Sequence, residues 1–205
     1  MGSGSLTSPV YTHDVFLSYT ACAPVGPWVR DAFYPKLKEW LTASLPKAPK
    51  IFIDREIEVG AAWPKKLEEA LIQSKVMVCI WAPPYFGSKW CMAEWKTMRR
   101  LAEISRRELG TDAPNGGLVY PIRFFDGDSF PQEARKVEHN TKFMNFTALT
   151  PRQLLVSKGF VTEVQQVADT LSRWINKAPQ PSPNWKAVRP RPIRQVNLSF
   201  DQVRL

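Results

Sequence analysis

The hexapeptide VMVCIW at residues 76–81 constrains the fold of this chain more than any other stretch, because it is apolar at every position. A strand with one solvated face alternates apolar and polar side chains, so this strand is predicted to be buried on both faces. Strands of that kind lie at the centre of parallel sheets that helices cover on both sides. The hexapeptide therefore predicts an α/β domain built around a parallel sheet.

Strand-like and helix-like segments alternate along the rest of the chain. Apolar spacing and turn residues predict strands at residues 14–19, 50–53, 76–81, 118–125 and 142–146. They predict helices at residues 27–44, 64–74, 88–109 and 160–176. The internal Pro35 should kink or split the first of these helices. The alternation is typical of a three-layer, doubly wound α/β sandwich, so we expect a five-stranded parallel sheet in the flavodoxin-like order 2-1-3-4-5.

The length and composition suit one globular domain. The chain has 205 residues, of which 44% are hydrophobic and 23% are charged. We expect a flexible leader at residues 1–10, the domain at residues 11–177, and a tail or linker rich in proline and arginine at residues 178–205. The prolines and charges of this tail predict that it is largely dispensable for folding. No apolar run approaches the roughly 18–20 residues that a membrane helix requires, so we expect no membrane association.

The cysteines and histidines show no metal-binding pattern. Cys22, Cys79 and Cys91 have neither a CxxC spacing nor a neighbouring histidine. A sparse, odd set of this kind indicates reduced thiols and favours a cytoplasmic protein. His13 and His139 are isolated from other ligand-type residues, so we expect no metal site.

The net charge of +9 raises the question of an anionic partner. Part of this charge lies in the tail, and much of the rest lies on one face of the helix predicted at residues 88–109. Such a distribution favours a solvated surface that steers an anionic substrate or partner. A nucleic-acid-binding function through the tail is the weakest of the interpretations, and we do not expect it.

The predicted strand order also predicts where a ligand-binding crevice lies. It brings the first strand beside the third, and the topological switch point then lies between their C-terminal ends. Ser18, Tyr19 and Thr20 should therefore line one crevice together with the loop at residues 82–90. Neither GxGxxG nor GxxxxGK[ST] occurs, so the fingerprints of a dinucleotide-binding fold and of a P-loop are absent from the sequence.

The helix that follows this crevice carries Glu94. At 100° per residue, one stripe faces the sheet and consists of Cys91, Trp95, Met98, Ala102 and Leu109. Glu94 lies on the flank of this stripe, one turn from Trp90. A partly desolvated carboxylate beside an indole can hold ribose hydroxyls and stabilise developing positive charge. The alternative is structural, because the helix dipole favours an acidic residue in the first turns of any helix.

Taken together, these segments resemble a Toll/interleukin-1 receptor (TIR) domain, and in particular the bacterial NAD-cleaving TIR proteins. The resemblance covers residues 11–176 and is carried by DVFLSY at 14–19, FID at 52–54 with Gly60, residues 67–70, Ser74, the strand at 76–81, and SKWCMAE at 88–94. It implies that Glu94 is the catalytic residue of a W-x-x-x-E segment that begins at Trp90. It also implies that residues 54–63 form the BB loop, which opens the site and takes part in self-association. One departure is Thr20-Ala21-Cys22, where some enzymatic members carry arginines.

The crevice and the resemblance together define the expected site. Glu94 is expected to be catalytic, and the expected substrate-binding residues are Trp90, Ser18, Tyr19, Asp54, Arg55, Trp63 and Phe86. Trp63 occupies about the position where several enzymatic members carry an aromatic residue that contacts the nicotinamide side.

The resemblance implies an NAD⁺ glycohydrolase or cyclase that breaks the nicotinamide–ribose bond. NAD⁺ is then the substrate, and no cofactor is expected. Attack by water gives ADP-ribose, attack by an adenine nitrogen gives a cyclic ADP-ribose, and another nucleophile gives a conjugate or related signal nucleotide. The setting implied is bacterial immune defence, with TIR–TIR self-association and a downstream effector that senses the product. The alternative is a non-enzymatic TIR adaptor that acts only by self-association.

Overall fold

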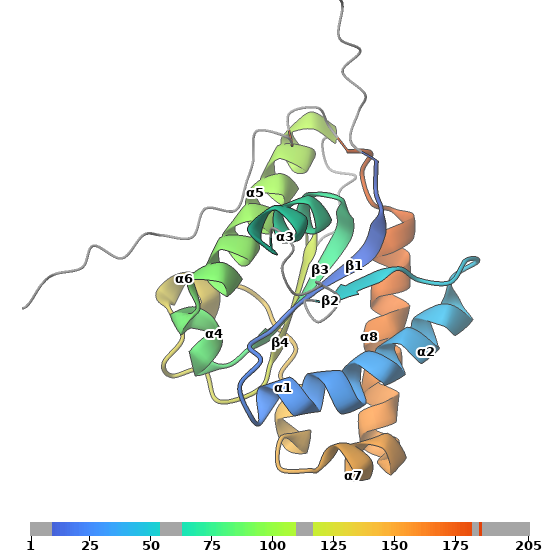
Figure 1. The fold of residues 1–205 in the computed structure, drawn as a ribbon, viewed down its shortest axis with the longest axis vertical. Coiled ribbons are helices and arrows are strands. Elements are labelled where there is room, and N and C mark those ends of the chain that lie inside the picture. The colour runs from blue at the N-terminus through green and yellow to red at the C-terminus, as the bar shows by residue number, and fades with distance from the viewer. Residues whose placement is uncertain (1–9, 54–62, 110–116, 182–184, 186–205) are drawn as a thin grey trace, which may run out of the picture.

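The computed structural model of the chain describes residues 10–53, 63–109, 117–181 and 185. Within these residues four strands form one sheet: β1 (His13–Ser18), β2 (Ile51–Ile53), β3 (Ser74–Trp81) and β4 (Val119–Arg123). All neighbouring strands are parallel, and their order is β2-β1-β3-β4 (Figure 1). The α/β class and the order of the first four predicted strands are therefore confirmed.

Strand β3 is central, as its uninterrupted apolar run predicts. It pairs with β1 on one side, in the register Leu17↔Val78, and with β4 on the other, in the register Cys79↔Pro121. Its side chains alternate between two hydrophobic clusters, one on each face of the sheet. Burial on both faces follows, and every residue of the hexapeptide at 76–81 is buried.

The first predicted helix is divided into three parts, as Pro35 predicts. It consists of α1 (Val25–Trp28), a π-helical turn η1 (Val29–Phe33) and α2 (Tyr34–Ser44). The N–H of Tyr34 donates to the carbonyl of Val29, five residues earlier, and Pro35 then lies in the first turn of α2. A proline is tolerated there because its missing N–H would have no partner within the new helix.

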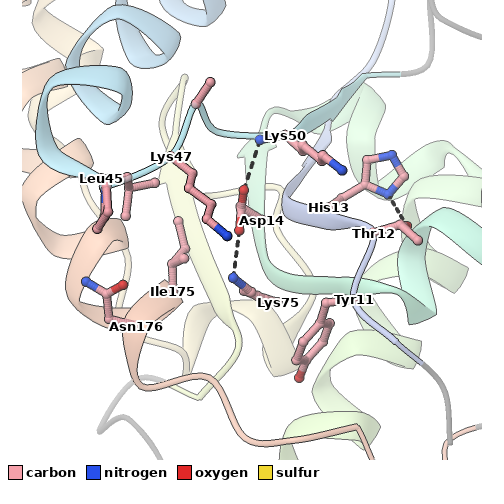
Figure 2. Close-up of a pocket in the computed structure, with 12 residues that line it drawn as sticks. Tyr11, Thr12, His13, Asp14, Leu45, Lys47, Lys50, Lys75, Ile175 and Asn176 are labelled. Carbon is pink, nitrogen blue, oxygen red and sulfur yellow. Dashed lines mark hydrogen bonds and ion pairs between the residues drawn. The ribbon is translucent and has the colours of Figure 1, made fainter.

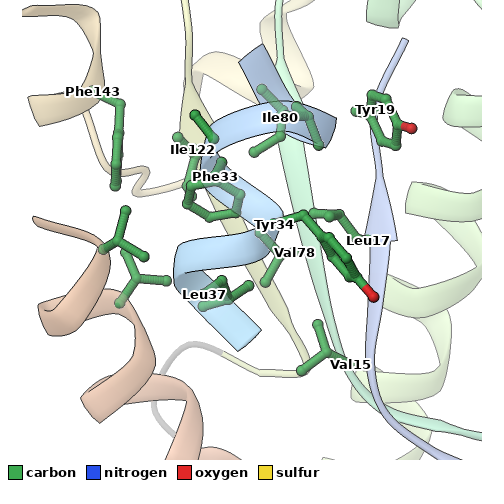
Figure 3. Close-up of a cluster of buried hydrophobic side chains, with 14 of the residues drawn as sticks. Val15, Leu17, Tyr19, Phe33, Tyr34, Leu37, Val78, Ile80, Ile122 and Phe143 are labelled. Atoms are coloured by element: carbon green, nitrogen blue, oxygen red, sulfur yellow. The ribbon is translucent and has the colours of Figure 1, made fainter. Parts of the chain in front are cut away.

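These helices cover one face of the sheet together with α7 (Pro151–Val156) and α8 (Lys158–Asn176). Figure 3 shows Phe33 and Leu37 of this layer beside Val78 and Ile80 of β3. Trp28 lies among aromatic rings, stacked on Phe33 with the centroids 5.3 Å apart. Aromatic pairs of this kind contribute about 0.5–1.5 kcal/mol beyond the burial of their area. This layer is the larger part of the core.

The opposite face of the sheet carries α3 (Trp63–Ile72), α4 (Pro83–Gly87), α5 (Lys89–Leu109) and α6 (Gln132–Arg135). Helix α5 presents the predicted stripe to the sheet, and its four members with described side chains are buried: Cys91, Trp95, Met98 and Ala102. The hydroxyl of Ser88 accepts a bond from the N–H of Cys91 at 3.3 Å and so caps this helix. Helix α4 occupies part of the segment that the sequence predicted to be a loop.

The fifth predicted strand, at residues 142–146, is wrong. The segment forms a 3₁₀ helix, η4 (Lys142–Phe146). Phe143 and Phe146 are three residues apart, which is one turn of a 3₁₀ helix, and both rings contact Phe160 of α8. In the described part of the chain, the strand-like pairing on this side of β4 is an isolated parallel bridge between Asn140 and Ile122.

Part of the predicted tail belongs to the core. Trp185 is 1% exposed, and its ring packs edge-on against that of Tyr11 with the centroids 6.0 Å apart. The hydroxyl of Tyr11 donates to the carbonyl of Pro179 at 2.5 Å. The burial of Trp185 counts against the expectation that residues 178–205 are largely dispensable for folding, and truncation tests that expectation. In the residues that the structure describes, no helix combines the length and the apolar character needed to cross a bilayer.

Candidate active site

The candidate site lies where β1 ends and α5 begins. Ser18 is the last residue of β1, and Glu94 lies in the second turn of α5. The hydroxyl of Ser18 donates a hydrogen bond of 2.6 Å to Oε2 of Glu94. Both side chains are buried, with 2% of Ser18 and 6% of Glu94 exposed. A short bond to a charged acceptor is about twice as strong as a neutral one, so it orients the carboxylate firmly.

Tyr85 of α4 extends this pair into a chain of three groups. Its hydroxyl lies 3.0 Å from Oγ of Ser18, and the side chain is fully buried. A serine hydroxyl has one proton, and that of Ser18 is directed to Glu94, so Tyr85 is the donor in the second bond. Burial raises the pKa of Tyr85 well above its usual value, and the charge of Glu94 raises it further. Tyr85 therefore stays a neutral donor at physiological pH.

Two buried thiols lie close to the carboxylate. Burial raises the pKa of Cys79 well above its usual value, and the nearby Glu94 adds to this rise. The thiol of Cys91 donates to the carbonyl of Tyr19 at 3.7 Å. Cys79 is therefore a neutral thiol, and its environment is apolar. In such surroundings a carboxylate interacts with a cationic group more strongly than it does in water.

The site coincides with the topological switch point of the sheet. The chain adds β2 on one side of β1 and β4 on the far side of β3, so the connections diverge between β1 and β3. In open α/β sheets ligands bind at the carboxyl ends of the strands at this point. The carboxyl end of β1 is where Ser18 meets Glu94.

The structure brings some of the expected residues together and separates others. Ser18 meets Glu94, but the side chain of Tyr19 belongs to the cluster on the opposite face of the sheet (Figure 3). The reason is the alternation of side chains along a strand, which continues through Tyr19. The side chain of Tyr19 therefore packs on the face of the sheet away from α5, its backbone carbonyl accepts from the thiol of Cys91, and its assignment to the substrate stays a prediction.

The aromatic residues near the site are half-buried. Trp90 lies one turn before Glu94 on α5 and packs at the edge of the core cluster on this face. Phe86 of α4 contacts Phe130, with the ring centroids 4.7 Å apart, and also Trp81 at 5.5 Å. Each residue therefore combines a packing role with some exposed surface.

Three of the expected substrate-binding residues are not placed by the structure. Asp54 and Arg55 lie outside the described residues. Trp63 is the first residue of α3, and its side chain is outside the described set. Their assignment to the substrate stays a prediction.

Sequence reasoning missed Tyr85 and Cys91 as neighbours of the site. Tyr85 lies in a segment expected to line the crevice, but a Pro-Pro-Tyr-Phe-Gly run does not show which ring points inward. Cys91 was assigned only to the core stripe. The sequence offered one signal for both residues: each lies within nine positions of Glu94 in the chain. Among the described residues no group of three or more His, Cys, Asp or Glu side chains could hold a metal ion.

A comparison with protein families finds a match over most of this region. The model of the TIR domain family matches residues 15–136, and the chain belongs to this family. The matched region runs from β1 through α6 and includes Ser18, Tyr85 and Glu94.

Among solved structures, the chain is similar to the TIR domains in a structure described as the activated Roq1 resistosome directly recognizing the pathogen effector XopQ. The identity is 20%, the match covers 81% of this chain and 96% of that chain, and the TM-score is 0.39. No curated protein matches the chain.

Proposed function

We propose that this TIR domain is an NAD⁺ nucleosidase, which cleaves the bond between nicotinamide and ribose with Glu94 as the catalytic carboxylate. The observation that carries the proposal is the buried carboxylate at the switch point, held by Ser18 at 2.6 Å. A purely structural acidic residue in a helix gains from the dipole without being buried. Burial of a carboxylate costs free energy, and a role in chemistry explains why the chain bears that cost.

The chemistry of the proposed reaction suits a single carboxylate. Cleavage of the nicotinamide–ribose bond passes through an oxocarbenium-like transition state, as in glycoside hydrolysis. Nicotinamide leaves as a neutral amine, so the departure needs no strong general acid. A carboxylate such as Glu94 holds the ribose hydroxyls and stabilises the positive charge that develops on the sugar.

Ser18 and Tyr85 then act as positioning residues. The chain of bonds from Tyr85 through Ser18 fixes one oxygen of Glu94. A carboxylate that is oriented in advance loses no reorganisation energy when the charge forms. We assign the nicotinamide riboside part of the substrate to aromatic walls formed by Trp90, Phe86 and, from the start of α3, Trp63.

The nucleophile decides the product, and we propose ADP-ribose, a cyclic ADP-ribose or a related signal nucleotide. In this proposal the product reports infection in a bacterial defence pathway and a downstream effector senses it. The cytoplasm, which holds NAD⁺, is the compartment that this function requires.

The TIR family self-associates, and we propose that assembly completes the site in this chain. The BB loop at residues 54–63 carries Asp54, Glu56 and Glu58. The solvent face of α5 is basic, with a hollow of about 500 Å³ lined by Lys96, Arg99, Arg100, Glu103, Ile104 and Arg107. Part of this charge is already paired, because Lys96 lies 3.3 Å and Arg99 lies 3.9 Å from the carboxylate of Glu133. The remainder is suited to acidic residues from a neighbouring chain.

The test is incubation of the purified protein with NAD⁺ at high protein concentration, with products identified by chromatography and mass spectrometry. We expect cleavage by the natural sequence and its loss in Glu94→Gln, with unchanged circular dichroism. Glu69→Gln is the matched control, because Glu69 is an exposed glutamate on α3. Near-normal turnover by a folded Glu94→Gln variant would overturn the assignment. Absence of cleavage by the natural sequence would favour the adaptor function.

A further inference from the structure

A pocket lies at the end of the sheet opposite Glu94. It has a volume of about 410 Å³ and opens where β1 begins, between the loop from α2 to β2 and the C-terminal end of α8 (Figure 2). Asp14 in this pocket and Ser18 in the candidate site are four residues apart on β1, which is about 13 Å along a strand. The two sites are therefore separate. We call this pocket the basal pocket.

The charged groups of the basal pocket are predominantly cationic. Its lining includes Lys47, Lys50 and Lys75 against one carboxylate, that of Asp14. Three ammonium groups and one carboxylate leave a surplus of two positive charges. A pocket with this balance attracts anions, because a concave surface concentrates the field of its charges.

The lysines differ in their partners. Lys75 forms an ion pair with Asp14 at 2.8 Å, and the same carboxylate accepts from the backbone N–H of Lys50 at 2.9 Å. Figure 2 shows the side chain of Lys47 pointing toward Asp14, and that of Lys50 extending toward His13. The positive charge of Lys50 contributes to lowering the pKa of His13, although burial is the larger cause.

Lys47 is the cation that is most available to a ligand. Within the described residues, no carboxylate lies within ion-pair distance of Lys47 or of the ammonium group of Lys50. Lys75 has three N–H donors, of which Asp14 takes one. Lys47 and Lys75 can therefore both donate to an oxyanion, while Lys50 adds to the field from the rim.

The remaining walls of the basal pocket suit an organic group. Leu45 and Pro46 form one side, and Ile175 at the end of α8 forms another. The amide of Asn176 lies beside them. The volume exceeds that of a single inorganic ion and lies within the range of small-molecule sites, which is about 300–1,000 Å³.

We propose that the basal pocket binds a phosphomonoester, with the phosphate against the ammonium groups of Lys47 and Lys75, beside Asp14, and the organic part against Leu45 and Ile175. A phosphomonoester carries a charge of about −1.5 to −2 at pH 7, which matches the surplus of positive charge. A carboxylate or a sulfate ester carries one negative charge and matches it less well. This binding does not depend on cleavage of NAD⁺, because Glu94 takes no part in it.

Calorimetric titration with phenyl phosphate tests the proposal. Phenyl sulfate has the same shape with one charge fewer, and inorganic phosphate lacks the organic part. We expect saturable binding of phenyl phosphate at millimolar or lower concentration, and binding of each of the other two probes that is weaker by about fivefold or more. The titration is repeated with Glu94→Gln, which should bind equally well. This arm separates a failure of the proposed catalytic function from a failure of the basal pocket.

Substitutions that are expected to change the affinity for phenyl phosphate in opposite directions make the test specific. We expect Lys47→Gln to weaken phenyl phosphate binding about tenfold, because it removes one charge-assisted hydrogen bond. Lys38→Gln is the matched control, since Lys38 is an exposed lysine of α2 that does not line the pocket, and its effect should stay under about twofold. Asp14→Asn should tighten binding, because it removes the repelling carboxylate and frees Lys75. The proposal is overturned if the natural sequence shows no saturable binding, or if Lys38→Gln weakens binding as much as Lys47→Gln.

Discussion

The hydroxyl of Ser18 donates to Oε2 of Glu94 across 2.6 Å and joins the end of β1 to the second turn of α5. The two residues are 76 positions apart in the chain. Their contact depends on the pairing of β1 with β3, because α5 follows β3 and α4 and is positioned by them. The orientation of the candidate catalytic carboxylate is therefore a property of the assembled sheet.

Removal of this hydroxyl should slow the proposed reaction without preventing substrate binding. Ser18→Ala leaves Glu94 without one charge-assisted bond, which is worth about 1.5–3 kcal/mol. We expect kcat for NAD⁺ cleavage to fall about tenfold or more, with KM nearly unchanged. Steady-state kinetics measure both constants. Tyr85→Phe is the control, because it keeps the donor of Ser18, and its kcat should fall less; equal losses would show that Ser18 does not orient Glu94.

The aromatic residue at the start of α3 should act on substrate affinity. Trp63→Ala removes one predicted wall of the nicotinamide site, and stacking of this kind contributes about 0.5–1.5 kcal/mol. We expect the apparent KM to rise roughly two- to tenfold, with a small change in the melting temperature. Trp90→Ala should raise KM and also lower the melting temperature, because Trp90 packs against the core. Unchanged kinetics in Trp63→Ala would place the BB loop away from the site.

Specific activity should depend on protein concentration and on salt. The proposed contact between the acidic BB loop and the basic face of α5 consists of exposed ion pairs, each worth about 0–1 kcal/mol. Salt screens such pairs over about 8 Å at physiological ionic strength. We expect specific activity to fall on dilution and to fall further at high salt. The measurement is a dilution series at two salt concentrations, beside sedimentation; a constant specific activity from a strictly monomeric protein would refute assembly.

Shortening the chain should separate the docked residue from the rest of the tail. A chain that ends at Lys177 lacks Trp185, and loss of a buried tryptophan side chain costs about 3–5 kcal/mol. A domain of this size loses about 2–4 °C in melting temperature for each kcal/mol. We expect a clear drop for the chain that ends at residue 177, measured by thermal unfolding. A chain that ends at residue 185 should melt close to the full chain, and an equal drop in both would assign the stability to the later residues.

The position of Glu94 shows what the local sequence pattern can predict. The helical period at residues 88–109 identified the buried stripe and put Glu94 on its flank, because a helix repeats every 3.6 residues whatever it packs against. The same holds for β3, whose unbroken apolar run is compatible only with burial on both faces. The resemblance to a TIR domain rested on these local segments, and the family match confirms it.

The partners of Glu94 required the tertiary structure. Tyr85 is 67 positions from Ser18, and nothing in the sequence around either residue specifies their bond. Helix α4 turns the Tyr85 hydroxyl inward, and the register pairs Ser18 with Cys79, two residues before β3 ends at Trp81 and the chain enters α4. Contacts of this kind follow from how elements pack, so they are decided only when the layers meet.

Residues 142–146 and Trp185 also separate what the local sequence predicts from what packing decides. Local pattern predicted the first segment to be a strand, but the segment forms a 3₁₀ helix whose Phe143 packs against Phe160. The composition of residues 178–205 predicted a tail, yet Trp185 is buried against Tyr11, which lies near the N-terminal end of the domain's sequence. The sequence alone determined the fold class, the central strand and the helix that carries Glu94, because each depends on the periodicity of one segment. The tertiary structure decided the conformation of residues 142–146, the hydrogen bonds that link Tyr85, Ser18 and Glu94, and the docking of Trp185. Each of these depends on a surface that distant segments build together.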